Sequence, residues 1–254
     1  MAMTAASLAE LPRAAEAVRS ALSEVGLSPE RPVLVLVGGA SRISAAVSTR
    51  LSKVLGCLTA VLDETGAAVV DGGTAFGVMA AMGEARRRAR AGFPLIGVAA
   101  MGTVDSERLP GHARCGRILD ACVPVGARGV ALDPNHSHFI LVPGERWGDE
   151  SPWIHAVAQA LAGRRPSLTL VAAGGEFTRL DVAGSLAARR PCLVLDGSGG
   201  VSDLLAAWAR GEGGPPGPEL TGGDLSLLRI LALDTAEDFL PDVLREAFAP
   251  EARA

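Results

Sequence analysis

Two histidines and the only asparagine of the chain lie in the segment LDPNHSHFILV, residues 132–142. On an extended strand His136 and His138 would face the same side, where two imidazoles could share a metal ion. A third ligand would be needed, and Asp133 is the only one nearby in sequence, so we expect no metal. The DPN sequence instead predicts an Asx-type turn into a strand, with Asn135 or His136 directed into a ligand pocket. A satisfied buried histidine is the alternative.

Glycine pairs offer a second kind of chemistry, the binding of phosphate. Four Gly-Gly pairs each follow an apolar run: Gly38-Gly39, Gly72-Gly73, Gly174-Gly175 and Gly199-Gly200. Glycine lets the backbone approach a phosphate closely, and the N-terminus of a following helix offers unpaired N–H groups. Because the carboxyl ends of parallel strands open on one edge of a sheet, these loops predict a site for a nucleotide-like ligand. Ordinary glycine-rich turns are the alternative.

Polar side chains beside the glycine pairs could contact the same ligand. Arg42 follows the first loop, where its guanidinium could hold a phosphate through two hydrogen bonds. Asp71 and Asp196 end apolar runs just before glycines, and their carboxylates suit either ribose hydroxyls or the anchoring of the loop. The remaining candidates beside the pairs are Ser41, Thr74, Glu176, Gly197 and Ser198.

The segment ERWGDESPW supplies a further group of candidate residues. Trp147 could stack on an adenine, and packing of a helix onto the sheet is an equal alternative. Asp149 and Glu150 precede a predicted helix, where acids stabilise the positive end of the helix dipole more often than they act as catalysts.

Several function classes are disfavoured by the same sequence. The first loop, GGASRI, is not GxGxxG, and GGTAFGVM lacks the Lys-Ser/Thr of a P-loop, so neither an ordinary dinucleotide dehydrogenase nor a P-loop NTPase is expected. A net charge of -4 argues against a nucleic-acid partner. No continuous apolar run reaches the ~18 residues of a membrane span, and the N-terminal residues lack a signal-peptide pattern, so we expect a cytoplasmic protein without a membrane partner.

Apolar runs alternate with segments of helical periodicity along most of the chain. This pattern predicts an α/β fold, a Rossmann-like doubly wound and mostly parallel sheet of about six or seven strands flanked by helices. Residues 103–131 are too long for an ordinary loop and could carry a short strand. Predicted strands lie within 31–39, 67–74, 94–102, 138–144, 168–176, 192–200 and 228–234, and predicted helices at 5–25, 42–56, 75–90, 149–163, 177–189 and 201–210.

The predicted domain organisation is a single domain with appended ends. Residues 1–30 would form an N-terminal helix packed on the core, residues 31–210 the ligand-binding domain, and residues 211–223 a linker rich in glycine and proline. Residues 224–254 would complete the same domain with a strand and a helix, which we expect to be capped by Asp234.

Five segments together resemble the SLOG superfamily: VVDGGTAFGVMAAMGEA, IGVAAMGTV, LDPNHSHFILV, WGDE and CLVLDGSGGVSDLLA. They run in family order, and the branch they resemble most lies at the N-terminus of melastatin-type TRP channels and in standalone prokaryotic proteins. The resemblance implies a Rossmann-like sheet that senses nucleotides, with ADP-ribose-like compounds as the leading ligand class.

The same superfamily includes the Lonely Guy phosphoribohydrolases, whose PGGxGTxxE motif supplies a catalytic glutamate. The corresponding loop of this chain, AAGGEFTRLDV, keeps Gly174 and Gly175. We interpret the proline, the Gly-Thr step and the spaced glutamate as missing. Glu176 or Asp181 could replace that carboxylate, with Glu176 the first choice, although we place neither at the family's spacing. This departure favours binding over hydrolysis.

These observations lead to one main hypothesis and two alternatives. The main hypothesis is a binding or sensing module for ADP-ribose or a related adenine nucleotide, with no cofactor and with assembly into a homodimer or higher homo-oligomer. The first alternative is a hydrolase that cleaves the N-glycosidic bond of a nucleotide, with Glu176 as the carboxylate. The second is a structural subunit whose pocket is vestigial.

Overall fold

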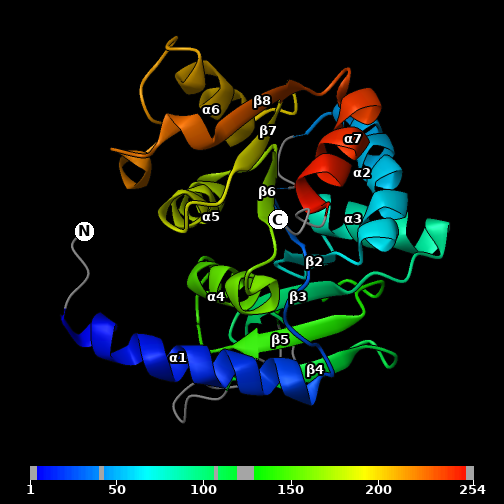
Figure 1. The fold of residues 1–254 in the computed structure, drawn as a ribbon, viewed down its shortest axis with the longest axis vertical. Helices are drawn as coiled ribbons and strands as arrows, with labels where there is room; N and C mark the ends of the chain where they lie inside the picture. The colour runs from blue at the N-terminus through cyan, green and yellow to red at the C-terminus, as the bar shows by residue number, and fades with distance from the viewer. Residues whose placement is uncertain (1–4, 40–42, 106–107, 119–128, 250–254) are drawn as a thin grey trace, which may run out of the picture.

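The apolar runs of the sequence form most of the strands of one sheet (Figure 1). The computed structural model describes residues 5–39, 43–105, 108–118 and 129–249. All pairings are parallel, and the strand order is β4-β5-β3-β2-β1-β6-β7-β8. The strands are β1 (Val33–Gly38), β2 (Ala68–Asp71), β3 (Leu95–Ala100), β4 (Arg114–Arg117), β5 (His138–Val142), β6 (Ser167–Ala172), β7 (Cys192–Asp196) and β8 (Leu228–Ala232).

The predicted α/β class and parallel sheet are confirmed, with eight strands where about six or seven were expected. The additional strand is β4, which lies in the long segment 103–131 and pairs with β5 at the edge of the sheet. Its sequence, RCGR, has no apolar run, so hydrophobicity alone could not have located it.

Helices cover both faces of the sheet (Figure 1). The buried side chains of α1, α4, α5 and α6 pack on one face, and those of α2, α3 and α7 pack on the other. The helices are α1 (Ala5–Glu24), α2 (Ala45–Thr65), α3 (Gly77–Ala89), α4 (Ser151–Ala162), α5 (Glu176–Ala187), α6 (Val201–Ala209) and α7 (Ala236–Phe248), with short 3-10 turns η1 (Pro218–Leu220) and η2 (Leu225–Leu227).

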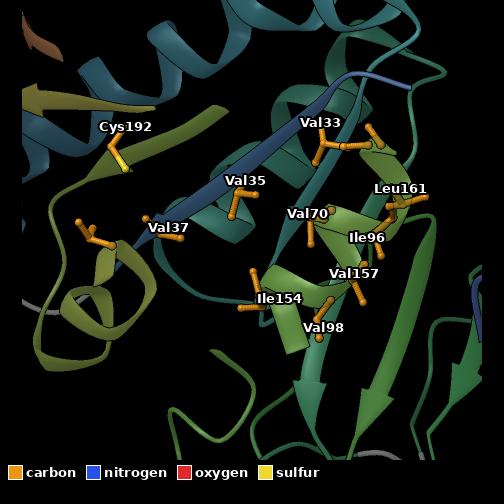
Figure 2. Close-up of a cluster of buried hydrophobic side chains, with 14 of the residues drawn as sticks. Val33, Val35, Val37, Val70, Ile96, Val98, Ile154, Val157, Leu161 and Cys192 are labelled. Atoms are coloured by element: carbon orange, nitrogen blue, oxygen red, sulfur yellow. The ribbon is translucent and has the colours of Figure 1, made fainter. Parts of the chain in front are cut away.

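Strand periodicity explains why the central runs are apolar throughout. Successive side chains point to opposite faces, so Val33, Val35 and Val37 of β1 lie in the same buried cluster as Ile154 and Val157 of α4 (Figure 2). The intervening leucines of β1 pack with α2 and α3 on the other face. A sheet that is covered on both sides therefore requires apolar residues at consecutive positions.

Helix α2 extends well beyond the predicted range 42–56. Ser44 caps its start by accepting a hydrogen bond from the backbone N–H of Val47, and Gly66 ends it in the left-handed conformation. By length and composition alone, this helix could cross a membrane. Its buried residues pack on the sheet in the same cluster as those of α3 and α7.

The C-terminal elements complete the sheet and one helical layer. Strand β8 pairs with β7, and Glu219 of the preceding η1 turn forms an ion pair with Arg179 of α5. The prediction that Asp234 caps the last helix is wrong, because α7 begins after Thr235 without a side-chain cap. The carboxylate of Asp234 instead forms an ion pair with Arg50 of α2.

Candidate functional site

The order of the strands reverses its direction between β1 and β6. The chain builds the sheet in one direction from β1 to β2 and β3, and in the other from β6 to β7 and β8. The loops after β1 and β6 therefore turn away from each other above neighbouring strands, and open α/β sheets bind their ligands at such a point. The first and third glycine pairs occupy these two loops.

These two loops pack backbone against backbone. A Cβ atom added to Gly39 would lie 3.1 Å from the Cα of Gly174, and one added to Gly38 would overlap the carbonyl oxygen of Ala172. Gly174 also has a positive φ of 97°, which side chains disfavour. Close packing therefore accounts for Gly38, Gly39 and Gly174. At Gly175 an added Cβ would meet open space, so close packing does not require a glycine there.

The loop after β7 satisfies its own hydrogen-bond donors. The backbone N–H groups of Gly197 and Gly199 donate to Oδ1 of Asp203, at 2.8 and 3.0 Å. The Asp203 carboxylate of α6 thus already accepts from two backbone donors of the kind that hold a phosphate in a glycine cradle. The backbone donors of this loop are therefore engaged by the helix that follows it.

The other predicted residues of this loop are also engaged within the protein. The Ser198 hydroxyl is buried, accepts from the Ala173 N–H at 2.8 Å and donates to the Leu195 carbonyl at 2.5 Å. Asp196 forms an ion pair of 2.7 Å with Arg210 at the surface. A Cβ on Gly200 would overlap the Gly174 carbonyl oxygen. These contacts fix the loop after β7 against the loop after β6.

The side chain of Asp71 anchors the loop after β2. This carboxylate is fully buried, and its Oδ1 accepts the N–H of Gly73 at 2.7 Å. Of the two roles predicted for Asp71, the geometry therefore corresponds to holding the loop. Gly72 and Thr74 of the same loop face a cavity at the sheet edge.

His136 joins this loop to the turn before β5. Its Nε2 lies 2.9 Å from Oδ1 of Asp71, and its Nδ1 lies 2.8 Å from Oδ2 of Asp133. Burial by itself lowers the pKa of His136, but the negative charge of Asp71 and the hydrogen bonds to both carboxylates raise the pKa to about 9. An imidazolium thus lies between two carboxylates in the interior.

The segment 132–142 consequently has a structural role in this fold. The backbone N–H of Asn135 donates to Oδ2 of Asp133 at 3.0 Å, which confirms the predicted Asx-type turn. Neither Asn135 nor His136 is among the residues that line the cavity at the sheet edge. His138 is the first residue of β5, and its Nδ1 lies 2.8 Å from the hydroxyl oxygen of Ser137.

A cavity of about 150 Å³ lies at the ends of β1 and β2, next to the first turns of α4 and α5. Its walls are mainly apolar, and its polar side chains come from two threonines and two acids. The lining residues are Leu36, Val37, Gly38, Gly72, Thr74, Met79, Trp147, Glu150, Ile154, Phe177, Thr178 and Asp181. The cavity therefore connects two predicted glycine loops with the WGDE segment and α5.

Two carboxyl groups share this cavity. Burial and the nearby charge of Glu150 together raise the pKa of Asp181 to about 7, against the lowering effect of a hydrogen bond from Ser151. The Ser151 hydroxyl donates to Oδ1 of Asp181 at 2.5 Å. Burial also raises the pKa of Glu150, whose Oε2 accepts the Gly148 N–H at 3.0 Å. Near neutral pH this pair can therefore carry a proton that it could exchange with a ligand.

Aromatic side chains border the cavity where it meets solvent. Trp147 is 42% exposed and Phe177 is 43% exposed, which is high for aromatic residues. A Cβ on Gly148 would lie 2.9 Å from Cδ1 of Phe177, so the turn after Trp147 lies directly against α5. Exposed aromatic faces beside an apolar cavity are suited to contact a planar ring.

The carboxylate preferred from the sequence does not face this cavity. Glu176 is exposed at the first position of α5 and is absent from the lining residues, whereas Asp181 lines the cavity one and a half turns further along. Our interpretation of the spacing was wrong for Asp181. Counted from Gly175, Thr178 and Asp181 fall at the threonine and glutamate positions of PGGxGTxxE, and Phe177 replaces its third glycine.

Thr178, in the first turn of α5, also holds the loop that precedes this helix. It is buried, and its Oγ1 accepts the Gly175 N–H at 3.3 Å. The candidates Ser41 and Arg42 lie outside the described residues. Sequence reasoning missed Thr178 and Met79 altogether; correct counting of the motif could have found the first, and no local pattern indicated the second.

Comparisons with known proteins support the superfamily resemblance. A family model described as SLOG in TRPM, prokaryote, matches residues 31–238, a range that includes β1 through β8. One solved structure that resembles the chain, the X-ray structure of the structural-genomics target TM1055, has 17% sequence identity and a TM-score of 0.49, with 84% of this chain and 98% of that chain covered. The comparison with curated proteins found no match.

Proposed function

Because the chain belongs to the prokaryotic family of SLOG domains related to those of TRPM channels, we propose that it binds a nucleotide-derived ligand at the carboxyl edge of its sheet. ADP-ribose or a related adenine nucleotide is the leading ligand. The observation that carries this proposal is the cavity at the ends of β1 and β2, where glycine loops, two carboxyl groups and two exposed aromatic side chains meet. Ligand pockets commonly combine apolar walls with a few convergent polar groups.

The free cysteines of the described residues suit a reducing compartment, so the proposal includes a cytoplasmic location. Cys57 is exposed, Cys115 is partly buried and Cys192 is buried, and none of them forms a disulfide. Thiols of this kind are typical of proteins in the reduced cytosol.

A thermal-shift screen with chromatography of each mixture tests the proposed function. The purified protein would be heated with ADP-ribose, cyclic ADP-ribose, NAD or AMP. A true ligand at a hundredfold excess over its Kd should stabilise the folded state by about 2.7 kcal/mol. No shift at millimolar concentration of any compound would contradict the proposal and leave the structural subunit as the better hypothesis.

Replacing Trp147 connects such a shift to the cavity. The Trp147→Ala variant should reduce the ligand-induced shift, because this side chain lines the cavity. Phe239→Ala is the matched control, since Phe239 is 59% exposed on α7 and lies on the opposite layer of the fold. An equal loss of shift in both variants would show that the ligand binds elsewhere or non-specifically.

Hydrolysis of an N-glycosidic bond is a second candidate, favoured by the position of Asp181 in the cavity at the family's glutamate spacing. In this reaction the protonated carboxyl of Asp181 gives its proton to the departing base as the bond to C1′ breaks. Water then adds to C1′ and loses a proton to the Asp181 carboxylate, which restores the starting state.

Product analysis separates the two candidates. An enzyme should release free base from AMP or ADP-ribose, and Asp181→Asn should abolish the release while the ligand-induced thermal shift remains. Glu176→Gln is the control, because the exposed Glu176 side chain does not line the cavity. Release of base by the Asp181 variant at the rate of the unchanged protein would contradict a hydrolytic role for this residue.

A further inference from the structure

The cavity beside Asp181 differs from a phosphate site in its charge. None of the described residues that line it is basic, and two of them, Glu150 and Asp181, are acids. A third acid, Glu176, stands in the first turn of α5, where the N-terminus of the helix would otherwise attract an anion. A phosphate placed here would lie beside acidic groups, without a compensating cation among the described lining residues.

The loop before α5 has also lost the open geometry of a phosphate cradle. At the third glycine of PGGxGTxxE this chain has Phe177, whose ring lines the cavity and is partly exposed. The N–H of Gly175 is already donated to Oγ1 of Thr178. An aromatic ring therefore stands where a bare backbone would be needed to approach a phosphate closely.

The same features suit an uncharged planar ring. The cavity of about 150 Å³ has the apolar side chains of Leu36, Val37, Met79 and Ile154 as walls. Aromatic residues at its border can stack on a base, and such stacking tolerates different bases because each has a π-face. A ring that enters here would exchange contact with water for contact with these side chains.

Resting on the proposed function, we infer that this cavity receives the uncharged heterocyclic base of the ligand, with its phosphates outside, so that nucleosides bind without any phosphate. The Asp181 carboxyl is the group that forms hydrogen bonds with the edge of the base. A protonated carboxyl offers an O–H donor and a carbonyl acceptor side by side, and adenine presents an acceptor, N7, beside the N6 amino donor.

Calorimetric titration with four probes tests this inference: adenine, adenosine, ADP-ribose and ribose 5-phosphate. We expect adenosine to bind within about tenfold of ADP-ribose, and ribose 5-phosphate to bind at least about a hundredfold more weakly, because stacking of the base supplies much of the affinity. Binding of ADP-ribose and ribose 5-phosphate without adenosine would overturn the inference and leave the proposed function intact. Absence of binding by all four would overturn both.

Restoring the glycine of the family motif provides a second test. The Phe177→Gly variant should lose about tenfold in adenosine affinity, the range expected for one stacked aromatic ring. Phe239→Ala should bind adenosine as the unchanged protein does, and thermal unfolding would verify that both variants are folded. Unchanged adenosine affinity in Phe177→Gly would overturn the placement of the base.

Discussion

Two acidic clusters lie near the same edge of the sheet, and they hold their carboxyl groups in opposite ways. In the first, Asp71 and Asp133 flank the fully buried His136, whose raised pKa keeps the imidazole charged. In the second, Glu150 and Asp181 face an open cavity without a basic side chain among the described lining residues, and their own pKa values are raised. A cation lies between the carboxyl groups of the first cluster, whereas burial shifts those of the second toward the protonated form.

This difference teaches which cluster is available to a ligand. The hydrogen bonds of the first cluster connect a glycine loop, a turn and a strand, so its residues already have partners inside the protein. The second cluster has apolar walls and aromatic side chains next to carboxyl groups that can gain or lose a proton. Residues 132–142 gave the most conspicuous pattern of reactive side chains in the sequence. They belong to the cluster with a structural role, not to the one that faces the cavity.

The largest expected effect comes from removing the cation of the first cluster. The His136→Ala variant should lose about 3–5 kcal/mol of unfolding free energy, because it leaves two buried carboxylates without their partner. Denaturant unfolding would measure this loss. His112→Ala is the control, since His112 is exposed, and its effect should stay within about 0.5 kcal/mol. A His136 variant as stable as this control would contradict the structural role of the first cluster.

The charge of His136 should also appear in the pH dependence of stability. Its folded pKa of about 9 lies above the ordinary histidine pKa of 6.5, so its stabilising effect is complete below about pH 6.5 and is lost as the pH rises through 9. The difference in unfolding free energy between the unchanged protein and His136→Asn should therefore shrink by up to ~3 kcal/mol between pH 6 and 10. A constant difference would mean that His136 is neutral.

Asp181 should also make the folded state less stable as the pH rises, but its replacement should stabilise the protein, whereas replacement of His136 destabilises it. The folded pKa of Asp181 is raised from 3.8 to about 7, so the folded state becomes less favourable as the pH rises between these values. Asp181→Asn removes this titration and should be more stable than the unchanged protein by roughly 1–2 kcal/mol at pH 8, a value reduced for the partial exposure of the side chain. Equal stability across the pH range would indicate that Asp181 is ionised throughout.

The smallest effect is expected from Ser151, whose hydroxyl donates to Asp181. Loss of this donor in Ser151→Ala should raise the pKa of Asp181 further, because the hydrogen bond favours the charged carboxylate. The stability cost should be about 1 kcal/mol or less at neutral pH. Carboxyl-carbon NMR titration would follow the pKa directly, and a lowered pKa would contradict the described contact.

Local sequence patterns were sufficient for most of the fold. Apolar runs and helical periodicity located all central strands and the helices between them, and the motifs identified the family that the family model confirms over residues 31–238. The patterns failed where a segment lacks such a signal. Strand β4 has no apolar run, and Asp234 is attracted to Arg50, a residue distant in sequence.

The candidate site was predictable only in part. The glycine pairs correctly pointed to the carboxyl edge, and Gly38, Gly72 and Thr74 do line the cavity. The sequence could not predict which backbone N–H groups of these loops remain free for a ligand. Asp203 accepts hydrogen bonds from the loop after β7, and Asp71 accepts one from the loop after β2. Such hydrogen bonds depend on backbone geometry that the residue types do not specify.

The sequence by itself determined that strands and helices alternate and that the four candidate glycine pairs come at strand ends, because periodicity and turn preference act over a few residues. Only the tertiary structure decided that β6 lies beside β1, that His136 meets Asp71 across 65 residues, and that Trp147 and Asp181 border one cavity. The protonation of the two acidic clusters was decided there as well. Desolvation and charge pairing depend on all the neighbours that folding brings together, and those neighbours come from distant parts of the chain.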